Sequence, residues 1–168
     1  VESFLDLLYQ CDLDCEHCYL DDKGSRNQKT AFWKDVLDQL AEMGVFKVIL
    51  SGGELFLRRD TLELIRYARS LGLAVRIKTH GGTLDKETIE ALGELSLLAV
   101  DLSYYSHRPE VHDAITRKPG SYARTHAAIE GLVAAGVRTV ASLVVMDRNA
   151  ADVPESVATL RALGAQPK

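Results

Sequence analysis

Apolar runs alternate with amphipathic segments along most of the chain. The apolar runs predict strands, and apolar residues spaced three and four apart predict helices between them. The predicted strands are residues 3–9, 46–51, 73–79, 97–103 and 137–146, and the predicted helices are residues 30–43, 60–72, 85–95, 121–135 and 152–164. A long connection through Pro109 and Pro119 is expected after the fourth strand. The pattern is therefore five strand–helix units in succession.

Glycines mark the ends of four of these helices. Gly44, Gly72, Gly136 and Gly164 each stand where a left-handed residue would end a helix before the next strand. Strands that alternate with helices imply a parallel sheet with helices over its outer face. A closed barrel of eight units usually takes about 250 residues, so five units predict either an open doubly wound sheet or an incomplete barrel.

Polar residues within the strands favour the incomplete barrel. In the third predicted strand, Arg76, Lys78 and His80 share one face and apolar residues share the other. A sheet covered by helices on both faces would read as nearly continuous apolar runs. We therefore expect a polar, ligand-holding interior. Arg76 and Lys78 indicate either an anionic ligand there or pairing with Asp6 and Asp101.

Composition and charge narrow the class of protein. The chain has 168 residues, 46% of them hydrophobic, which is enough for one domain with its own core. A net charge of −4 and the lack of a basic run argue against a nucleic-acid partner or an anionic membrane surface. No apolar stretch approaches the roughly 20 residues of a membrane helix, and no signal-peptide layout opens the chain. We expect a cytoplasmic protein.

The cysteines carry the clearest chemical signal. Cys11, Cys15 and Cys18 are the only cysteines, and they follow the first predicted strand directly. An odd, clustered set is a poor disulfide framework, and thiolates prefer soft metals such as zinc or iron in iron–sulfur clusters. Three cysteines can hold three corners of a [4Fe–4S] cluster and leave one iron open. A zinc site that adds His17 is disfavoured because His17 and Cys18 are adjacent, and unligated thiols are the other alternative.

Two motifs together resemble the radical S-adenosylmethionine (SAM) superfamily. They are the spacing Cys-x3-Cys-x2-Cys over residues 11–18 and Ser-Gly-Gly-Glu over residues 51–54. The resemblance implies a partial (βα)6 barrel of the TIM type, with residues 1–168 forming a core domain that stops after about five units. It also implies a [4Fe–4S] cluster on the cysteines and SAM on its open iron. Reductive cleavage of SAM, fed by an electron donor such as flavodoxin or ferredoxin, would give a 5′-deoxyadenosyl radical that abstracts hydrogen from substrate.

The resemblance assigns further residues to SAM. Gly52 and Gly53 would approach its methionine part, and Glu54 would accept from its ammonium group. His17 would lie by the adenine, and Ser103 would contact the ribose. The alternatives are an ordinary strand-to-helix turn, an exposed histidine and a strand-end serine.

The sequence departs from the family pattern at three places. Leu55 stands where proline is common. His80 stands where asparagine is frequent, so its side chain would supply the asparagine's hydrogen bond. Arg117 lies one residue after Thr116, where many relatives have an arginine that contacts the SAM carboxylate.

Residues 101–106, 109–116 and 119–122 resemble the peptide-modifying and cofactor-maturing branch, which often carries a SPASM or twitch domain. The expected substrate is a ribosomally made peptide or a cofactor or protein precursor, with a small molecule as the wider possibility. Cysteines for auxiliary clusters are absent, so we expect a truncated view of a longer enzyme. The residue that quenches the substrate radical is not identified. Competing hypotheses are a zinc or iron–sulfur structural or interaction domain without SAM chemistry, and a nonredox α/β enzyme.

Overall fold

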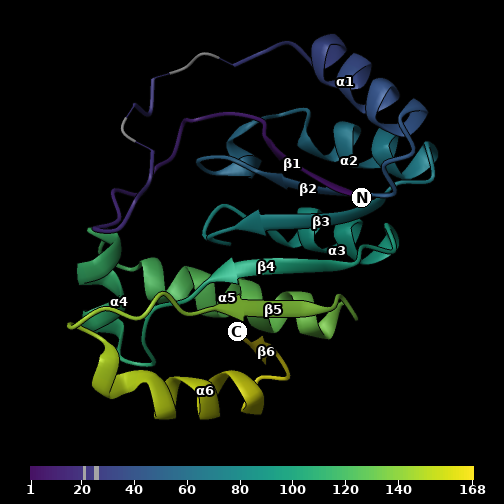
Figure 1. The fold of residues 1–168 in the computed structure, drawn as a ribbon. Coiled ribbons are helices and arrows are strands. Elements are labelled where there is room, and N and C mark those ends of the chain that lie inside the picture. Colours follow the sequence, from purple (N-terminus) through teal and green to yellow (C-terminus); the bar gives the residue numbers. More distant parts are fainter. Residues whose placement is uncertain (21, 25–26) are drawn as a thin grey trace.

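The computed structural model describes residues 1–20, 22–24 and 27–168. Its parallel strands form one sheet in the order β1-β2-β3-β4-β5-β6 (Figure 1). The strands are β1 (Glu2–Asp6), β2 (Lys47–Ser51), β3 (Ala74–Thr79), β4 (Ala99–Ser103), β5 (Thr139–Ser142) and β6 (Gln166–Pro167). Each strand pairs only with its neighbours in the chain, and no pairing of β1 with β6 is found within the described ranges. The sheet is therefore open, as expected of an incomplete barrel.

Helices connect successive strands. They are α1 (Thr30–Glu42), α2 (Thr61–Ser70), α3 (Lys86–Glu94), α4 (Pro109–Thr116), α5 (Ser121–Ala134) and α6 (Val153–Ala162), with short 3-10 turns η1 (Leu55–Leu57) and η2 (Ala150–Asp152). In Figure 1, α2, α3 and α5 lie behind the sheet, while the front of the sheet faces the open interior. In the part of the chain that the structure describes, no helix is long and apolar enough to cross a membrane.

The two faces of the sheet differ as the alternation predicts. Val48, Val75 and Val100 have no exposed surface and pack into the core beneath the helices. On the opposite face, Arg76 and Lys78 keep about a quarter and a third of their side chains exposed, at 26% and 38%. Burial of alternate apolar residues against one helical layer therefore leaves a polar face toward the interior.

The predicted pairing of charged interior residues is confirmed for one carboxylate. Arg76 donates from Nε and Nη2 to Asp101 at 2.7 to 3.0 Å, and the Lys78 ammonium lies 3.7 Å from the same carboxylate. Lys78 and Asp101 face each other across β3 and β4. Asp6 instead accepts from the hydroxyl of Tyr19 at 3.3 Å.

The long connection predicted after the fourth strand is wrong, because it contains α4. Pro109 occupies the first turn, where its missing N–H costs nothing. Val111 and Ile115, four residues apart, are buried against Tyr105. Arg117 ends the helix with a left-handed backbone, at φ 53°.

The fifth strand is also shorter than the predicted residues 137–146. The strand ends at Ser142. Asn149, which has no exposed surface, binds the chain that follows. The Asn149 amide donates to the carbonyls of Tyr105 at 2.8 Å and Val144 at 3.0 Å. The Val144 carbonyl thus finds a side-chain partner.

Candidate functional site

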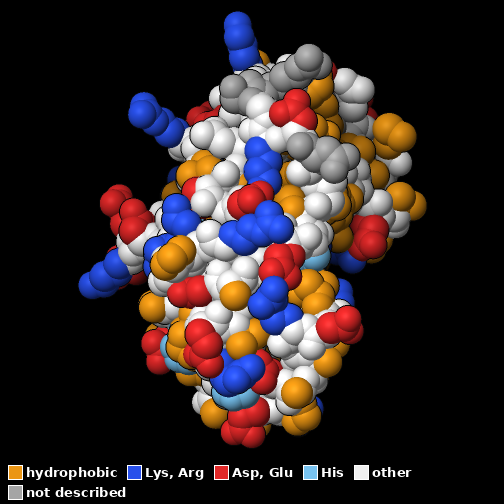
Figure 2. All heavy atoms as spheres, turned by 90° about the vertical axis from the view of Figure 1, so that its left-hand side faces the viewer, with side chains coloured by type: hydrophobic (Ala, Val, Ile, Leu, Met, Phe, Trp, Pro, Cys, Tyr) orange, Lys and Arg blue, Asp and Glu red, His pale blue; other side chains and the backbone are white. Residues whose placement is uncertain are grey.

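A cavity of about 290 Å³ lies at the carboxyl ends of the strands. Parallel strands bring these ends to one edge, where the segment after β1 meets the ends of β2 to β5. Eight of the predicted site residues line the cavity: Cys11, Cys15, His17, Cys18, Gly52, Gly53, His80 and Ser103. Figure 2, which looks onto this edge, shows acidic and basic side chains mixed over it. The fold thus brings together predicted site residues that are up to 92 positions apart in the chain.

The three cysteines are half-buried on the segment that follows β1. The Leu13 N–H donates to Cys11 Sγ at 3.4 Å, and the Cys18 N–H donates to the Cys15 carbonyl at 3.1 Å. Burial raises the pKa of the Cys11 thiol to about 11 and raises the pKa of Cys15, because a thiolate there loses hydration. A soft metal would displace these protons on binding, so the donor set fits iron or zinc.

Gly52 and Gly53 are required by contacts within the chain itself. A Cβ on Gly52 would lie 2.2 Å from the Leu8 carbonyl oxygen, and one on Gly53 would lie 2.2 Å from that of Gln10. The Gly53 N–H donates to Leu8 and the Glu54 N–H donates to Gln10, both at 2.8 Å. These glycines let the end of β2 bind the backbone just before Cys11. They also form part of the cavity wall, as the resemblance implies.

Glu54 follows β2 directly and is fully buried, and its expected contact with the SAM ammonium group stays a prediction. Its carboxylate has no exposed surface and is absent from the described cavity lining. It accepts from Thr79 Oγ1 at 2.7 Å, from the His80 N–H at 3.0 Å and from the Phe56 N–H at 3.1 Å. Glu54 therefore ties η1 to the end of β3, because its oxygens are occupied by protein donors.

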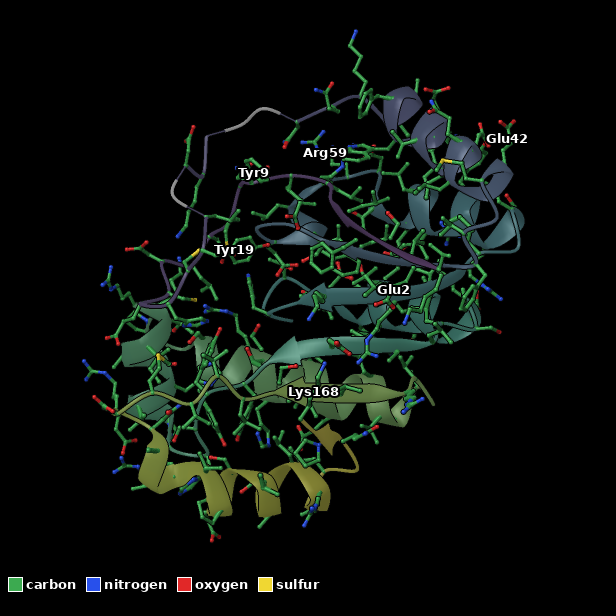
Figure 3. All side chains as sticks on the ribbon, viewed as in Figure 1. Glu2, Tyr9, Tyr19, Glu42, Arg59 and Lys168 are labelled. Carbon is green, nitrogen blue, oxygen red and sulfur yellow. The ribbon has the colours of Figure 1, made fainter. Side chains whose placement is uncertain are left out.

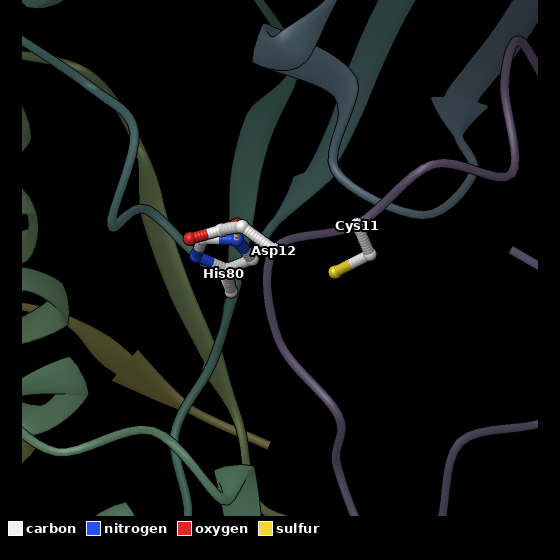
Figure 4. Close-up of side chains that lie close together, drawn as sticks. All are labelled: Cys11, Asp12 and His80. Atoms are coloured by element: carbon white, nitrogen blue, oxygen red, sulfur yellow. Dashed lines mark hydrogen bonds and ion pairs between the residues drawn. The ribbon is translucent and has the colours of Figure 1, made fainter. Parts of the chain in front are cut away.

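His80 connects this network to the cysteine segment. Its Nδ1 accepts from the Gly82 N–H at 3.0 Å, so Nε2 carries the proton. Nε2 donates to Asp12 at 2.8 Å and lies 3.1 Å from Glu54. Figure 4 shows the Asp12 carboxylate against the imidazole, with the Cys11 sulfur nearby. Asp12 is not among the residues that the sequence predicts, and its signal there is its position next to Cys11.

His17 and Tyr105 form a second polar edge of the cavity. Their rings meet edge to face at 5.0 Å, and the Tyr105 hydroxyl lies 3.2 Å from His17 Nε2. His17 Nδ1 is buried without a hydrogen-bond partner among the described residues. Desolvation lowers the pKa of His17 and so favours the neutral ring. A buried polar atom without a partner fits a ligand with hydrogen-bonding edges, such as adenine.

Ser103 and Arg117 have different outcomes. Ser103 lines the cavity at the end of β4, beside Ser142 in the sheet register. Arg117 is absent from the described lining, and its side chain is 57% exposed and pairs with Asp14 at 3.1 Å. The left-handed end of α4 leaves Arg117 on the surface, and its expected contact with a SAM carboxylate stays a prediction.

Comparison with known proteins finds curated relatives that are named as a peptide cyclase and as a maturase. It is 35% identical over 163 residues to PqqA peptide cyclase of Gluconobacter oxydans, covering 95% of this chain and 46% of that protein. It is 36% identical over 154 residues to the mycofactocin maturase MftC of Mycobacterium tuberculosis, covering 89% of this chain and 39% of the relative. The chain thus spans less than half the length of these relatives.

Solved structures agree in fold. The chain superposes on Streptococcus suis SuiB bound to the precursor peptide SuiA with a TM-score of 0.88 at 22% identity, covering 98% of this chain and 37% of SuiB. It also matches anSMEcpe with bound AdoMet at a TM-score of 0.83 and 15% identity, covering 99% of this chain and 49% of that one. Residues 7–160 match the family described as the Radical SAM superfamily. The chain belongs to the radical SAM superfamily.

Proposed function

We propose that Cys11, Cys15 and Cys18 hold a [4Fe–4S] cluster and that SAM binds in the adjoining cavity. The enzyme would cleave SAM reductively and abstract hydrogen from a ribosomally made peptide or from a cofactor or protein precursor. The observation that carries this proposal is the convergence of all three cysteines and His17 on one cavity of about 290 Å³. The three soft donors and the unpartnered His17 Nδ1 fit the two ligands.

The chain's own residues would hold and orient these groups. When bound, the cluster and SAM supply radical chemistry that amino-acid side chains lack. Backbone bonds from Gly53 and Glu54 to residues 8 and 10 fix the start of the cysteine segment. The hydrogen bond from His80 to Asp12 holds the same segment from the side of β3. Ser103 and the Tyr105–His17 pair supply polar contacts for a nucleoside.

The substrate proposal rests on the relatives' names. PqqA peptide cyclase and SuiB are named with the peptides PqqA and SuiA. Because this chain spans less than half of the curated relatives, the substrate and an electron donor such as flavodoxin or ferredoxin remain part of the proposal.

Anaerobic reconstitution tests the proposal. The full protein that contains this chain, given iron, sulfide, reductant and SAM, should bind a [4Fe–4S] cluster at the three cysteines and form 5′-deoxyadenosine. Cys15→Ser should abolish both results, whereas Ser70→Ala on α2, away from the cavity lining, should abolish neither. Zinc binding without any SAM cleavage by the wild-type protein would contradict the proposal.

A metal-binding domain without SAM chemistry is the second candidate. Ligand atoms of Cys11, Asp12 and His80 lie within 4.8 Å of one another, as a single metal ion requires. Under this alternative, Asp12→Asn should remove zinc binding. Under the radical SAM proposal, it should leave the iron content unchanged, because Asp12 is not a cluster ligand. Metal analysis of this variant separates the two candidates.

A further inference from the structure

A lysine ammonium faces the cavity from the interior of the half-barrel. Lys78 is the second-last residue of β3, lines the cavity and keeps 38% of its side chain exposed. The arginine that the resemblance assigned to a carboxylate, Arg117, is instead on the surface with Asp14. Lys78 is therefore a cation inside the cavity with no role in the binding of the cluster or SAM proposed above.

The carboxylate nearest to Lys78 is already occupied. Asp101, whose side chain is 3% exposed, receives three contacts of 2.7 to 3.0 Å from the Arg76 guanidinium. Lys78 Nζ lies 3.7 Å from Asp101, which is longer than a hydrogen bond. The Arg76 guanidinium binds both oxygens of the Asp101 carboxylate and balances its charge. The Lys78 ammonium therefore keeps N–H groups that can donate to a ligand.

A second acidic group on this face, at the same end of the sheet as Lys78, is engaged elsewhere. Asp6 sits on β1, opposite Ser51 of β2, and its carboxylate accepts from the Tyr19 hydroxyl at 3.3 Å. Burial raises the pKa of Asp6, which favours its neutral form. No ion pair between Lys78 and Asp6 is present within the described ranges. Figure 3 shows Tyr19 at the loop end of the sheet, away from Glu2 at the amino ends of the strands.

We infer that Lys78 binds a carboxylate of the substrate, such as a glutamate or aspartate side chain or a peptide C-terminus. The inference rests on the proposed function and names the chemistry of the substrate that it would select. The methionine carboxylate of SAM offers the same chemistry. We assign Lys78 to the carboxylate of the substrate and not to that of SAM. Lys78 lies within β3, whereas the cysteines and their proposed iron lie on the segment beyond the strand ends.

The binding test uses two matched probes that differ only in charge. N-acetylglutamate methylamide and N-acetylglutamine methylamide are titrated into the reconstituted full protein with SAM and without reductant, and binding is followed by ligand-observed NMR. One charge pair in a partly buried site predicts about tenfold tighter binding of the glutamate probe. Lys78→Met should remove this preference, and Lys78→Arg should retain it. Lys86→Met is the matched control, since Lys86 is 90% exposed on α3.

The cofactor is tested separately by titrating SAM and following the spectrum of the cluster. Lys78→Met should change the SAM affinity by less than about twofold, since no substrate charge is involved. A tenfold loss of SAM affinity would overturn the inference and assign Lys78 to the cofactor. Equal binding of the two probes by the wild type, or no binding of either, would also overturn it. A preference for glutamate without SAM cleavage would keep the inference and refute the proposed function.

Discussion

Arg58 donates from Nη1 to the carbonyl oxygen of Gln28 at 3.0 Å, across 30 residues of chain. The same nitrogen donates to the Leu7 carbonyl at 3.3 Å. Leu7 precedes the three cysteines and Gln28 follows them, so one guanidinium binds both stems of the cysteine segment. Asp60 holds Arg58 in place through contacts of 3.0 Å to Nε and 2.6 Å to Nη2.

Arg58→Met should destabilise the fold and remove the two hydrogen bonds that hold the stems of the cysteine segment. The Arg58 side chain is only 5% exposed, so its loss leaves two carbonyls and Asp60 without their partner. Breaking a buried ion pair from one side costs about 3 kcal/mol, which urea unfolding would measure. Arg59→Met is the control, because Arg59 is exposed. Equal stability of the two variants would contradict the role of Arg58.

Gly53→Ala should prevent the end of β2 from binding the backbone before Cys11. The added Cβ would meet the Gln10 carbonyl at 2.2 Å, so the two segments must move apart. Gly44→Ala has no such neighbour but requires a left-handed backbone at φ 78°, which costs about 1 kcal/mol. Thermal unfolding should show a larger loss for Gly53→Ala. A larger loss for Gly44→Ala would contradict the close contact assigned to Gly53.

Stability should fall as pH is lowered from neutrality because of His112. Burial among Tyr104, Tyr105 and Tyr122 lowers the pKa of His112 from 6.5 to about 4. Above pH 6.5 the His112 ring is neutral in both the folded and the unfolded protein. Below pH 6.5 the ring binds a proton in the unfolded protein but stays neutral in the folded protein. Stability should therefore drop by about 3 kcal/mol between pH 6.5 and 4.

His112→Phe isolates this effect, since it keeps an aromatic ring and removes the titrating group. The free energy of unfolding of each protein is measured in urea at several pH values. As pH falls, it should decrease more for the wild type than for the variant. A difference that does not change with pH would show that His112 is not the group responsible.

Arg76 and Asp101 should behave as a coupled pair. Asp101→Leu leaves a guanidinium in the half-barrel with its main partner gone, and Arg76→Met leaves a buried carboxylate with only Lys78 nearby. The double change should cost less than the sum of the two single changes, by a coupling energy of about 2 kcal/mol. A double-mutant cycle in urea measures this energy, and additive losses would refute the coupling.

Much of the fold follows from periodicity. Gly44 and Gly136 end helices at left-handed residues, as their positions predict. The helix α4 was missed because its polar residues and two nearby prolines read as a loop. Pro109 at its start, with Val111 and Ile115 four apart, is the signal that predicts it.

The site was predictable where the backbone alone decides it. The cysteines and the two glycines follow strand ends, and parallel strands bring such ends together. The direction of a side chain depends on the tertiary contacts around it. The contacts of Glu54 with Thr79 and His80 could therefore not be predicted from the sequence. The left-handed turn that places Arg117 on the surface is equally invisible in the pattern, because most residues at φ above zero are glycines.

The order of the strands in the sheet is the same as their order in the chain. Every new strand therefore finds its partner in the strand synthesised just before it, with one helix between them, or two between β4 and β5. Contacts of this kind have modest sequence separation, which favours rapid folding. The sheet can thus grow from β1 toward β6 while the chain is still leaving the ribosome, with the cysteine segment anchored once β2 has paired.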